Sequence, residues 1–171
     1  PLKGLHDGAK GRAPDGRASH GHPVESAMTD LRIAIVPVDT GPKSHSSRDG
    51  MNHTVATSPL FEAWPDRAET DCKAIEAAVK SQNFQVLGEL AEANALAMHA
   101  TMMAARPSLV YLKSGSWRVL ETLWQARDTG LEAYATMDAG ANVKLIFRDS
   151  ATQDVQQVFP AANIINPFAT R

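Results

Sequence analysis

Residues 131–147 read LEAYATMDAGANVKLIF, and this stretch decides the fold that the sequence predicts. Apolar and polar side chains alternate over residues 131–137, and residues 143–147 are again rich in apolar and β-branched side chains. Both patterns are typical of β-strands. The small and polar residues at 138–142 have the composition of a tight connection. The sequence therefore predicts two paired strands joined by a short loop that begins at Asp138.

Further strands and helices are predicted on both sides of this pair. Residues 31–38 predict a strand, and Pro37 belongs at its edge or end because proline cannot donate a ladder hydrogen bond. A last strand is expected at 164–165. A first helix is expected from a cap at Ser46 or Ser47, and a second over about 60–80, with a cap at Ser58 and a bend at Pro65. A third is expected from the cap Asn83 to Arg106-Pro107, and a fourth from the cap Ser116 to Gly130. A last helix is expected over 152–158. Because strands and helices do not alternate strictly, the predicted fold class is α+β, with an antiparallel-leaning sheet and helices packed on one face.

Composition excludes several classes of protein. The chain has 171 residues, of which 43% are hydrophobic and 21% charged, as in a globular domain. Lys and Arg total 17 against 19 Asp and Glu, and this near-balance argues against a nucleic-acid or membrane-surface protein. Cys72 is the sole cysteine, so no internal disulfide can form, which fits a reducing cytoplasm. No apolar run approaches the ~20 residues of a membrane span.

The first residues differ from the rest of the chain. Residues 1–23 hold five of the 11 glycines and few apolar side chains after Leu5. Glycine at this density favours the unfolded chain and offers little surface to bury. We expect residues 1–23 to be a flexible lead-in and residues 24–171 to form one domain. The chain begins at Pro1 without an initiator Met or a signal peptide, which is typical of a chain cut from a longer one.

The segment Ser46-Ser47-Arg48-Asp49-Gly50 lies at the start of a predicted helix. One interpretation is an ordinary capped helix start with a solvated arginine. The other is an anion site, because the free N–H groups and the positive dipole end of a helix favour negative charge. Serine hydroxyls and the Arg48 guanidinium would then bind phosphate oxygens.

Asp138 follows a predicted strand and enters a loop of small residues. Small side chains let a ligand approach the backbone, and a carboxylate at such a place could accept a hydrogen bond from a substrate hydroxyl or act as a base. The alternative is a hairpin turn in which Asp138 caps its own backbone.

Asn94 interrupts an apolar helix face that also carries Met98, His99, Met102 and Met103. This pattern fits either a polar group in a ligand cleft or a core methionine cluster with a hydrogen-bonded asparagine, and we favour the cluster.

Other patterns point to no site. His20 and His22 have no credible metal partners, and Cys72 lies within a predicted helix with no neighbouring base in the sequence. Neither a GxGxxG nor a GxxxxGK[ST] nucleotide motif occurs.

Four of these segments resemble the motifs of one family in order and spacing. Residues 46–51 (SSRDGM), 54–61 (TVATSPLF), 94–101 (NALAMHAT) and 136–140 (TMDAG) are similar to diphosphomevalonate decarboxylases of the GHMP kinase superfamily. The resemblance covers about residues 24–168 and only the C-terminal half of such an enzyme. The serine-rich ATP phosphate loop, the lysine strand and the Ser-Gly-Ser-x-x-Arg motif of the N-terminal half are not in this sequence. The resemblance implies the C-terminal α+β fold of the superfamily.

The resemblance also implies a reaction and its residues. Such enzymes use ATP and Mg²⁺ to phosphorylate the 3-hydroxyl of mevalonate diphosphate, and then release phosphate and CO₂ to leave isopentenyl diphosphate. Asp138 matches the catalytic aspartate, which would accept a hydrogen bond or proton from that hydroxyl and orient it toward the γ-phosphate. Ser47 and Arg48 match the contacts to the substrate phosphates. ATP and Mg²⁺ would be bound mainly by the N-terminal half, and we assign no metal ligand to this chain.

One residue departs from the family pattern, because Ala141 stands where the family has proline, and we expect it to loosen the positioning of Asp138. Without its N-terminal half as partner, the chain is expected not to turn over. A cytoplasmic homodimer is also expected. Two alternatives stay open: a related decarboxylase or kinase that acts on a monophosphorylated mevalonate, and a non-catalytic binding domain derived from the family.

Overall fold

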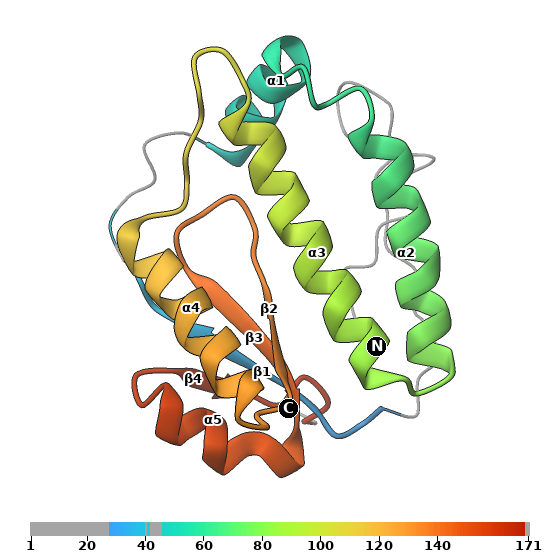
Figure 1. Ribbon diagram of the computed structural model, residues 1–171, viewed down its shortest axis with the longest axis vertical. Helices are drawn as coiled ribbons and strands as arrows, with labels where there is room; N and C mark the ends of the chain where they lie inside the picture. Colours follow the sequence, from blue (N-terminus) through green and yellow to red (C-terminus); the bar gives the residue numbers. More distant parts are fainter. Residues whose placement is uncertain (1–27, 40, 42–45, 170–171) are drawn as a thin grey trace.

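The computed structural model describes residues 28–39, 41 and 46–169. The predicted flexible lead-in at 1–23 lies outside these residues. In chain order the elements are β1 (Leu31–Val36), α1 (Ser47–Thr57), α2 (Trp64–Lys80), α3 (Phe84–Met103), α4 (Ser114–Asp128), β2 (Ala133–Thr136), β3 (Val143–Arg148), the short 3₁₀ helix η1 (Asp149–Ala151), α5 (Thr152–Val158) and β4 (Asn163–Ile165). The four strands form one sheet in the order β2-β3-β1-β4, and each neighbouring pair is antiparallel (Figure 1). The predicted α+β fold class is confirmed.

The strand pair of residues 131–147 is present as predicted. Strands β2 and β3 pair with Tyr134 opposite Ile146 and Thr136 opposite Lys144. Strand β1 lies between β3 and β4, and Pro37 follows its last residue, where no ladder hydrogen bond is needed. The hairpin joins the end of β2 to the start of β3, so the loop that begins at Asp138 lies at the ends of these two strands.

One face of the sheet forms the main core. Val143, Leu145 and Phe147 of β3 are fully buried and alternate with less buried residues, which is the period of a strand with one apolar face. They pack in one cluster with small residues of β1 and β2 and with apolar side chains of α4 and α5, among them Ala34, Val36, Ala133, Ala135, Leu120, Leu123 and Val155. This packing places α4 and α5 over the sheet.

Helix α3 passes the edge of the sheet beside β2, with α2 outside it (Figure 1). Its Ala95 belongs to the main core, whereas its Leu87 packs in a second cluster with Tyr134 of β2. A Cβ atom on Gly88 would lie 2.0 Å from Cδ2 of Tyr134, so α3 reaches β2 through a residue without a side chain. The α2–α3 pair therefore covers an edge of the sheet as well as part of its second face.

The edge of β2 is covered by Glu92 from α3 and Arg127 from α4. Glu92 Oε2 accepts a hydrogen bond from the Ala135 N–H at 2.8 Å, and Arg127 Nε donates to the Ala133 carbonyl at 3.2 Å. The two side chains also form a bidentate ion pair, with N–O distances of 2.6 and 3.2 Å. Trp124 Nε1 donates to the same carboxylate at 2.9 Å. The side chains thus satisfy the backbone groups of this edge.

Two predicted helix starts were wrong. Ser58 is the C-cap of α1, and α2 begins later, at Trp64, with Pro65 in its first turn and no bend. Proline suits that position because its missing N–H has no partner there in any helix. Helix α4 begins at Ser114, and Ser116 lies in its first turn, where its Oγ accepts from the Lys113 N–H at 3.1 Å.

Other helix boundaries were predicted correctly. Asn83 caps α3, with its side chain accepting from the Val86 N–H at 3.1 Å. Gly130, with a φ of 107°, follows α4, and this backbone angle favours glycine. The helix at Thr152–Val158 and the strand at Asn163–Ile165 are also present.

Candidate active site

The loop that begins at Asp138 is tied to α4 and to the segment after β1 through its backbone and its last side chain. The Ala141 carbonyl accepts a hydrogen bond from Ser116 Oγ of α4 at 2.6 Å. Asn142 Oδ1 accepts from the N–H groups of Val38 and Asp39, beyond β1, at 2.8 and 3.0 Å. Ser116 is fully buried, so the contact at Ala141 reaches into the interior, whereas the contacts of Asn142 are part-buried. Ala141, where the family has proline, is therefore fixed by its carbonyl.

The Asp138 side chain itself is exposed. Its side chain is 64% exposed, and Oδ2 lies 2.8 Å from Nζ of Lys144 on β3. Lys144 lies opposite Thr136 in the register of the hairpin, which brings its amine to the loop. An ion pair this exposed contributes only about 0–1 kcal/mol to stability, so the carboxylate stays accessible to a ligand at low cost.

His99 lies behind the loop, near the end of α3. It is only 2% exposed. Burial lowers the pKa of His99 from its ordinary value of 6.5, although the Asp138 backbone and the Asp138 charge act in the opposite direction. The imidazole is therefore neutral at pH 7. Within the described residues, its Nε2 atom has no hydrogen-bond partner.

The N-terminus of α1 carries the second group of predicted residues. Ser46 is the N-cap: its Oγ accepts from the Asp49 N–H at 3.1 Å and donates to Asp49 Oδ2 at 2.6 Å. Ser47 and Arg48 in the first helical turn are exposed. In the part of the chain that the structure describes, Arg48 forms no ion pair. The positive end of a helix, a hydroxyl and a guanidinium thus lie together on an open surface.

A small apolar cluster connects the two groups. Met102, Leu109 and Tyr111 are buried together, with Met98 and Ala139 packed against them. Ala139 follows Asp138 in the loop, so this cluster lies directly against the candidate catalytic residue. Of the three methionines singled out in the sequence, Met102 is a core residue and Met98 packs against it, as favoured, whereas Met103 is half-buried and lies outside this cluster.

Tyr111 joins this cluster to α1. Its hydroxyl donates to the Ser46 carbonyl at 3.4 Å, and a Cβ atom on Gly50 would lie 2.3 Å from the Tyr111 hydroxyl oxygen. Burial raises the pKa of Tyr111, and the nearby Asp49 carboxylate acts in the same direction. The phenol is therefore protonated and uncharged at neutral pH, as its hydrogen bond requires.

Asn94 does not belong to this site. Its Nδ2 donates to Asp71 Oδ2 at 3.3 Å, between α3 and α2. The interpretation of Asn94 as a polar group in a ligand cleft therefore finds no support, and its hydrogen bond fits the structural interpretation. Cys72 is half-buried on α2, and Lys43, His20 and His22 lie outside the described residues.

Four residues near the site were not singled out in the sequence. Lys144 lies on β3, Ser116 on α4 and Tyr111 in the segment between α3 and α4, and Asn142 was seen only as a loop residue. Lys144 could have been found from the hairpin register, since it lies opposite Thr136, two residues before Asp138. Ser116 and Tyr111 reach the site only through tertiary packing, for which a single sequence carries no signal.

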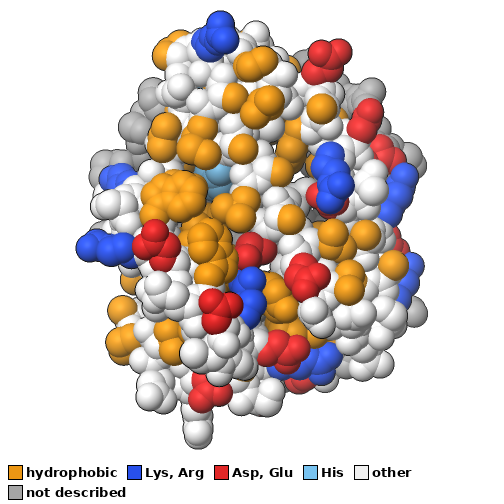
Figure 2. Space-filling model, in the orientation of Figure 1, with side chains coloured by type: hydrophobic (Ala, Val, Ile, Leu, Met, Phe, Trp, Pro, Cys, Tyr) orange, Lys and Arg blue, Asp and Glu red, His pale blue; other side chains and the backbone are white. Residues whose placement is uncertain are grey.

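Exposed apolar side chains lie on α1, after its C-terminus and at Val110. Figure 2 shows hydrophobic side chains gathered over the upper part of this face, near α1 and the adjoining end of α3. Met51 and Val55 of α1, Leu60 after it and Val110 are 61%, 51%, 51% and 59% exposed.

Within the described residues, no group of three or more His, Cys, Asp or Glu side chains could hold a metal ion. None of the described helices combines the length and apolarity that a membrane crossing requires.

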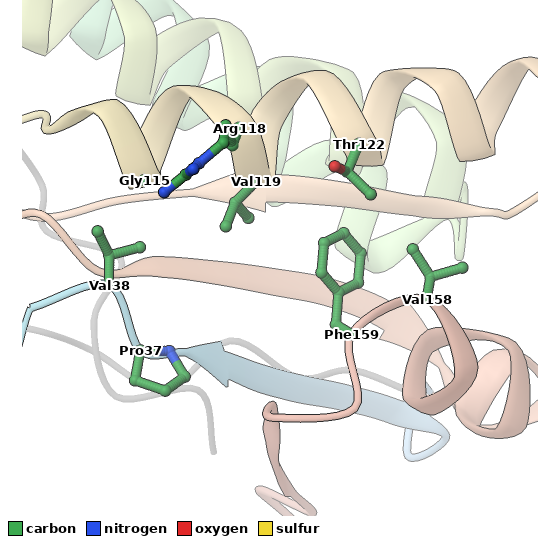
Figure 3. Close-up of a pocket in the computed structure, with 8 residues that line it drawn as sticks. All are labelled: Pro37, Val38, Gly115, Arg118, Val119, Thr122, Val158 and Phe159. Carbon is green, nitrogen blue, oxygen red and sulfur yellow. The ribbon is translucent and has the colours of Figure 1, made fainter.

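A hollow of about 320 Å³ lies elsewhere, between α4, the end of β1 and the residues after α5 (Figure 3). It is lined mainly by apolar side chains, with Arg118 and Thr122 beside them: Pro37, Val38, Gly115, Val119, Val158 and Phe159. It includes none of Asp138, Ser47 and Arg48, so we do not place the candidate site there.

Comparisons with known proteins identify the family of this chain. The family model of the mevalonate 5-diphosphate decarboxylase C-terminal domain matches residues 33–168. Diphosphomevalonate decarboxylase of Candida albicans is 32% identical over 153 residues, which cover 84% of this chain and 40% of that protein. The chain thus spans less than half the length of this relative.

Solved structures give the same result. MDDEF in complex with MVAPP, AMPPCP and magnesium is 32% identical, with a TM-score of 0.80 over 87% of this chain and 48% of that one. Mevalonate diphosphate decarboxylase from Enterococcus faecalis, solved in a study of mevalonate diphosphate-mediated ATP binding, is 31% identical, with a TM-score of 0.76 over 85% and 46%. With the family model matching most of its length, this chain belongs to the family of mevalonate 5-diphosphate decarboxylase C-terminal domains.

Proposed function

We propose that this chain is the C-terminal half of a diphosphomevalonate decarboxylase. Such an enzyme transfers the γ-phosphate of ATP to the 3-hydroxyl of mevalonate diphosphate. This transfer releases ADP, and the phosphorylated intermediate then loses CO₂ and inorganic phosphate to leave isopentenyl diphosphate. The observation that carries the proposal is the exposed Asp138 carboxylate, on a loop whose backbone is fixed by buried contacts, in a member of this family.

Asp138 is proposed as the catalytic residue. At 64% exposure its carboxylate can be reached by a substrate hydroxyl, and Lys144 keeps it near one orientation. It would accept a hydrogen bond or the proton of the 3-hydroxyl and direct that oxygen in line with the transferred phosphoryl group. Phosphoryl transfer depends almost entirely on positioning and charge neutralisation, so a fixed carboxylate at this place suits the step.

Ser47 and Arg48 are proposed to bind the diphosphate. Both are exposed in the first turn of α1, where the helix dipole favours an anion. Arg48 can donate two parallel hydrogen bonds to phosphate oxygens, and the Ser47 hydroxyl can donate a third. Arg48 has no ion-pair partner to give up among the described residues.

ATP and Mg²⁺ are proposed to be bound mainly by an N-terminal half, the expected partner of this chain. The residues described here present no cluster that fits a metal ion, so we derive no step through Mg²⁺. In the related MDDEF complex, MVAPP, AMPPCP and magnesium are bound by a chain about twice as long as the matched part. The exposed Met51, Val55 and Val110 beside the site are candidates for the contact with that half. Homodimer assembly and a cytoplasmic location stay predictions.

The test is reconstitution with an N-terminal half of the family, by co-expression or fusion, followed by an assay of ATP-dependent CO₂ release. Asp138→Asn keeps the shape of the side chain but removes its charge and basicity, and we expect kcat to fall by about 10²–10⁴-fold. Asp128→Asn, at the exposed end of α4, is the matched control and should leave the rate unchanged.

A near-normal rate for Asp138→Asn in the active assembly would remove Asp138 from the mechanism. Comparing turnover of mono- and diphosphorylated mevalonate separates this enzyme from a relative that acts on the monophosphate. If mevalonate diphosphate binds in calorimetry but no assembly releases CO₂, the chain is a binding domain.

A further inference from the structure

The hollow of Figure 3 lies apart from the residues of the candidate active site. Its volume of about 320 Å³ is at the lower end of the roughly 300–1,000 Å³ that is typical of small-molecule sites. Four of its lining residues, at positions 115, 118, 119 and 122, recur on one face of α4. The others come from the chain directly after β1 and from the end of α5. Three segments that are distant in the sequence therefore form the hollow.

The floor of the hollow is apolar and is fixed by the main core. Val119 and Val158 pack against that core, and Phe159 is part of it, with 6% of its surface exposed. Gly115 lets α4 approach the chain after β1, since a Cβ atom there would lie 2.7 Å from Val38 Cγ1. The hollow thus presents apolar surface to solvent, and covering that surface with an apolar group is favourable.

One side of the hollow carries a positive charge without a partner. In Figure 3 the Arg118 side chain extends along α4 beside the hollow, and Thr122 lies one turn further along the same face of the helix. Among the described residues, Arg118 makes neither an ion pair nor a hydrogen bond. None of the lining residues is acidic, and the nearby Asp39 carboxylate is already paired with Lys113. The guanidinium is therefore free to bind an anion.

We propose that this hollow binds a small amphipathic anion, namely a short apolar chain that ends in a phosphate. The chain would cover the apolar floor, and the phosphate would lie on Arg118 and Thr122. The guanidinium can donate two parallel hydrogen bonds and the hydroxyl a third, which matches the three terminal oxygens of a phosphate monoester. Mevalonate diphosphate is not a ligand of this class, because its chain carries a hydroxyl and a carboxylate.

The first experiment titrates the chain with a series of alkyl phosphates. Ethyl, butyl and hexyl phosphate share one head group, and affinity should rise about tenfold for each two methylenes that the hollow buries. ¹H–¹⁵N correlation spectra should show shifts at residues 38, 115–122 and 158–159, with residues 46–50 and 138–142 unchanged. Hexanol has the chain without the charge, and inorganic phosphate has the charge without the chain. Each should bind at least about tenfold more weakly than hexyl phosphate.

Two variants at exposed positions test the charge and the shape separately. Arg118→Ala removes the guanidinium and should weaken the binding of hexyl phosphate about tenfold or more. Thr122→Phe places a ring over the apolar floor and should abolish the rise of affinity with chain length. Arg48→Ala removes another exposed arginine that has no ion pair among the described residues. It is the matched control and should leave the binding of hexyl phosphate unchanged.

The two proposed sites can fail separately. Arg48→Ala should weaken the binding of mevalonate diphosphate and Arg118→Ala should not, which is the reverse of the pattern expected for hexyl phosphate. Equal affinity for hexanol and hexyl phosphate, spectral shifts away from the hollow, or unchanged binding in Arg118→Ala would overturn the proposal for the hollow. Loss of binding after an N-terminal half is added would also overturn it, because the hollow would then be a contact surface of that half.

Discussion

The two parts of the proposed site are supported in different ways. The loop at 138–142 is held by polar contacts to other elements, with Ser116 Oγ on the Ala141 carbonyl and Asn142 Oδ1 on the N–H groups of Val38 and Asp39. The N-terminus of α1 is capped by its own Ser46 and depends on one close contact between Gly50 and Tyr111. The difference indicates that the position of the carboxylate depends on hydrogen-bond geometry, whereas the position of the phosphate-binding turn depends on shape.

The largest effect on stability is expected at the close contact. Gly50→Ala would place a Cβ atom 2.3 Å from the Tyr111 hydroxyl and 2.9 Å from Leu109 Cδ2, so α1 must move away. Overpacking of this kind costs about 2–3 kcal/mol, which exceeds the gain of about 1 kcal/mol in helix propensity. Adding Tyr111→Phe removes the oxygen and should restore about half of the loss. Denaturant unfolding of the single and double variants checks this, and additive losses would contradict it.

The corresponding test of the loop is Ser116→Ala on α4. It removes the donor to the Ala141 carbonyl and the acceptor of the Lys113 N–H at a fully buried position. We expect about 1–3 kcal/mol of lost stability, with faster hydrogen exchange at residues 138–142 and no change in α1. If the exchange of α1 increased equally, the two regions would be one cooperative unit and the comparison would fail.

His99 should add a part to the pH dependence of stability. Burial lowers the pKa of His99 in the folded chain below its ordinary value of 6.5. Between the folded pKa and 6.5, the unfolded chain therefore binds more protons than the folded chain. Stability should therefore fall as the pH decreases from about 6.5, with a slope of at most about 1.4 kcal/mol per pH unit, and level off below the folded pKa. His99→Asn should remove this part of the slope and His53→Asn, on α1, should keep it. Equal profiles in the unsubstituted chain and His99→Asn would contradict the assignment.

The smallest effect on stability is expected from Arg48→Ala. The side chain is exposed and has no ion-pair partner in the described residues, so the free energy of unfolding should change by less than about 0.5 kcal/mol. Calorimetric titration with mevalonate diphosphate should nevertheless show affinity reduced by about tenfold or more. Arg118→Ala, beside the hollow of Figure 3, is the control and should bind like the unsubstituted chain.

Much of the fold could be predicted from local patterns. The hairpin, the cap at Asn83 and the glycine after α4 follow from residue types whose physical preferences are strong. The start of α2 was missed because Pro59 and Pro65 are both compatible with a first helical turn. The start of α4 was missed because Ser116 acts from inside the helix and bonds to a loop that is distant in the sequence.

The site was less predictable than the fold. The positions of Ser47, Arg48 and Asp138 follow from capping and strand patterns, while their roles came from the family resemblance. The link between the two groups could not be foreseen, since Tyr111 and Met102 meet Ala139 only after the helices pack.

The covered edge of β2 has a consequence for assembly. Glu92 and Arg127 already bond to the Ala135 N–H and the Ala133 carbonyl, which are the groups that an incoming strand would need. Adding a strand from a second molecule would first require breaking a bidentate ion pair between two helices. This protects the side of the sheet that carries the hairpin from aggregation by strand addition. Among the strands described, β4 is the one at which another molecule could extend the sheet without breaking this pair.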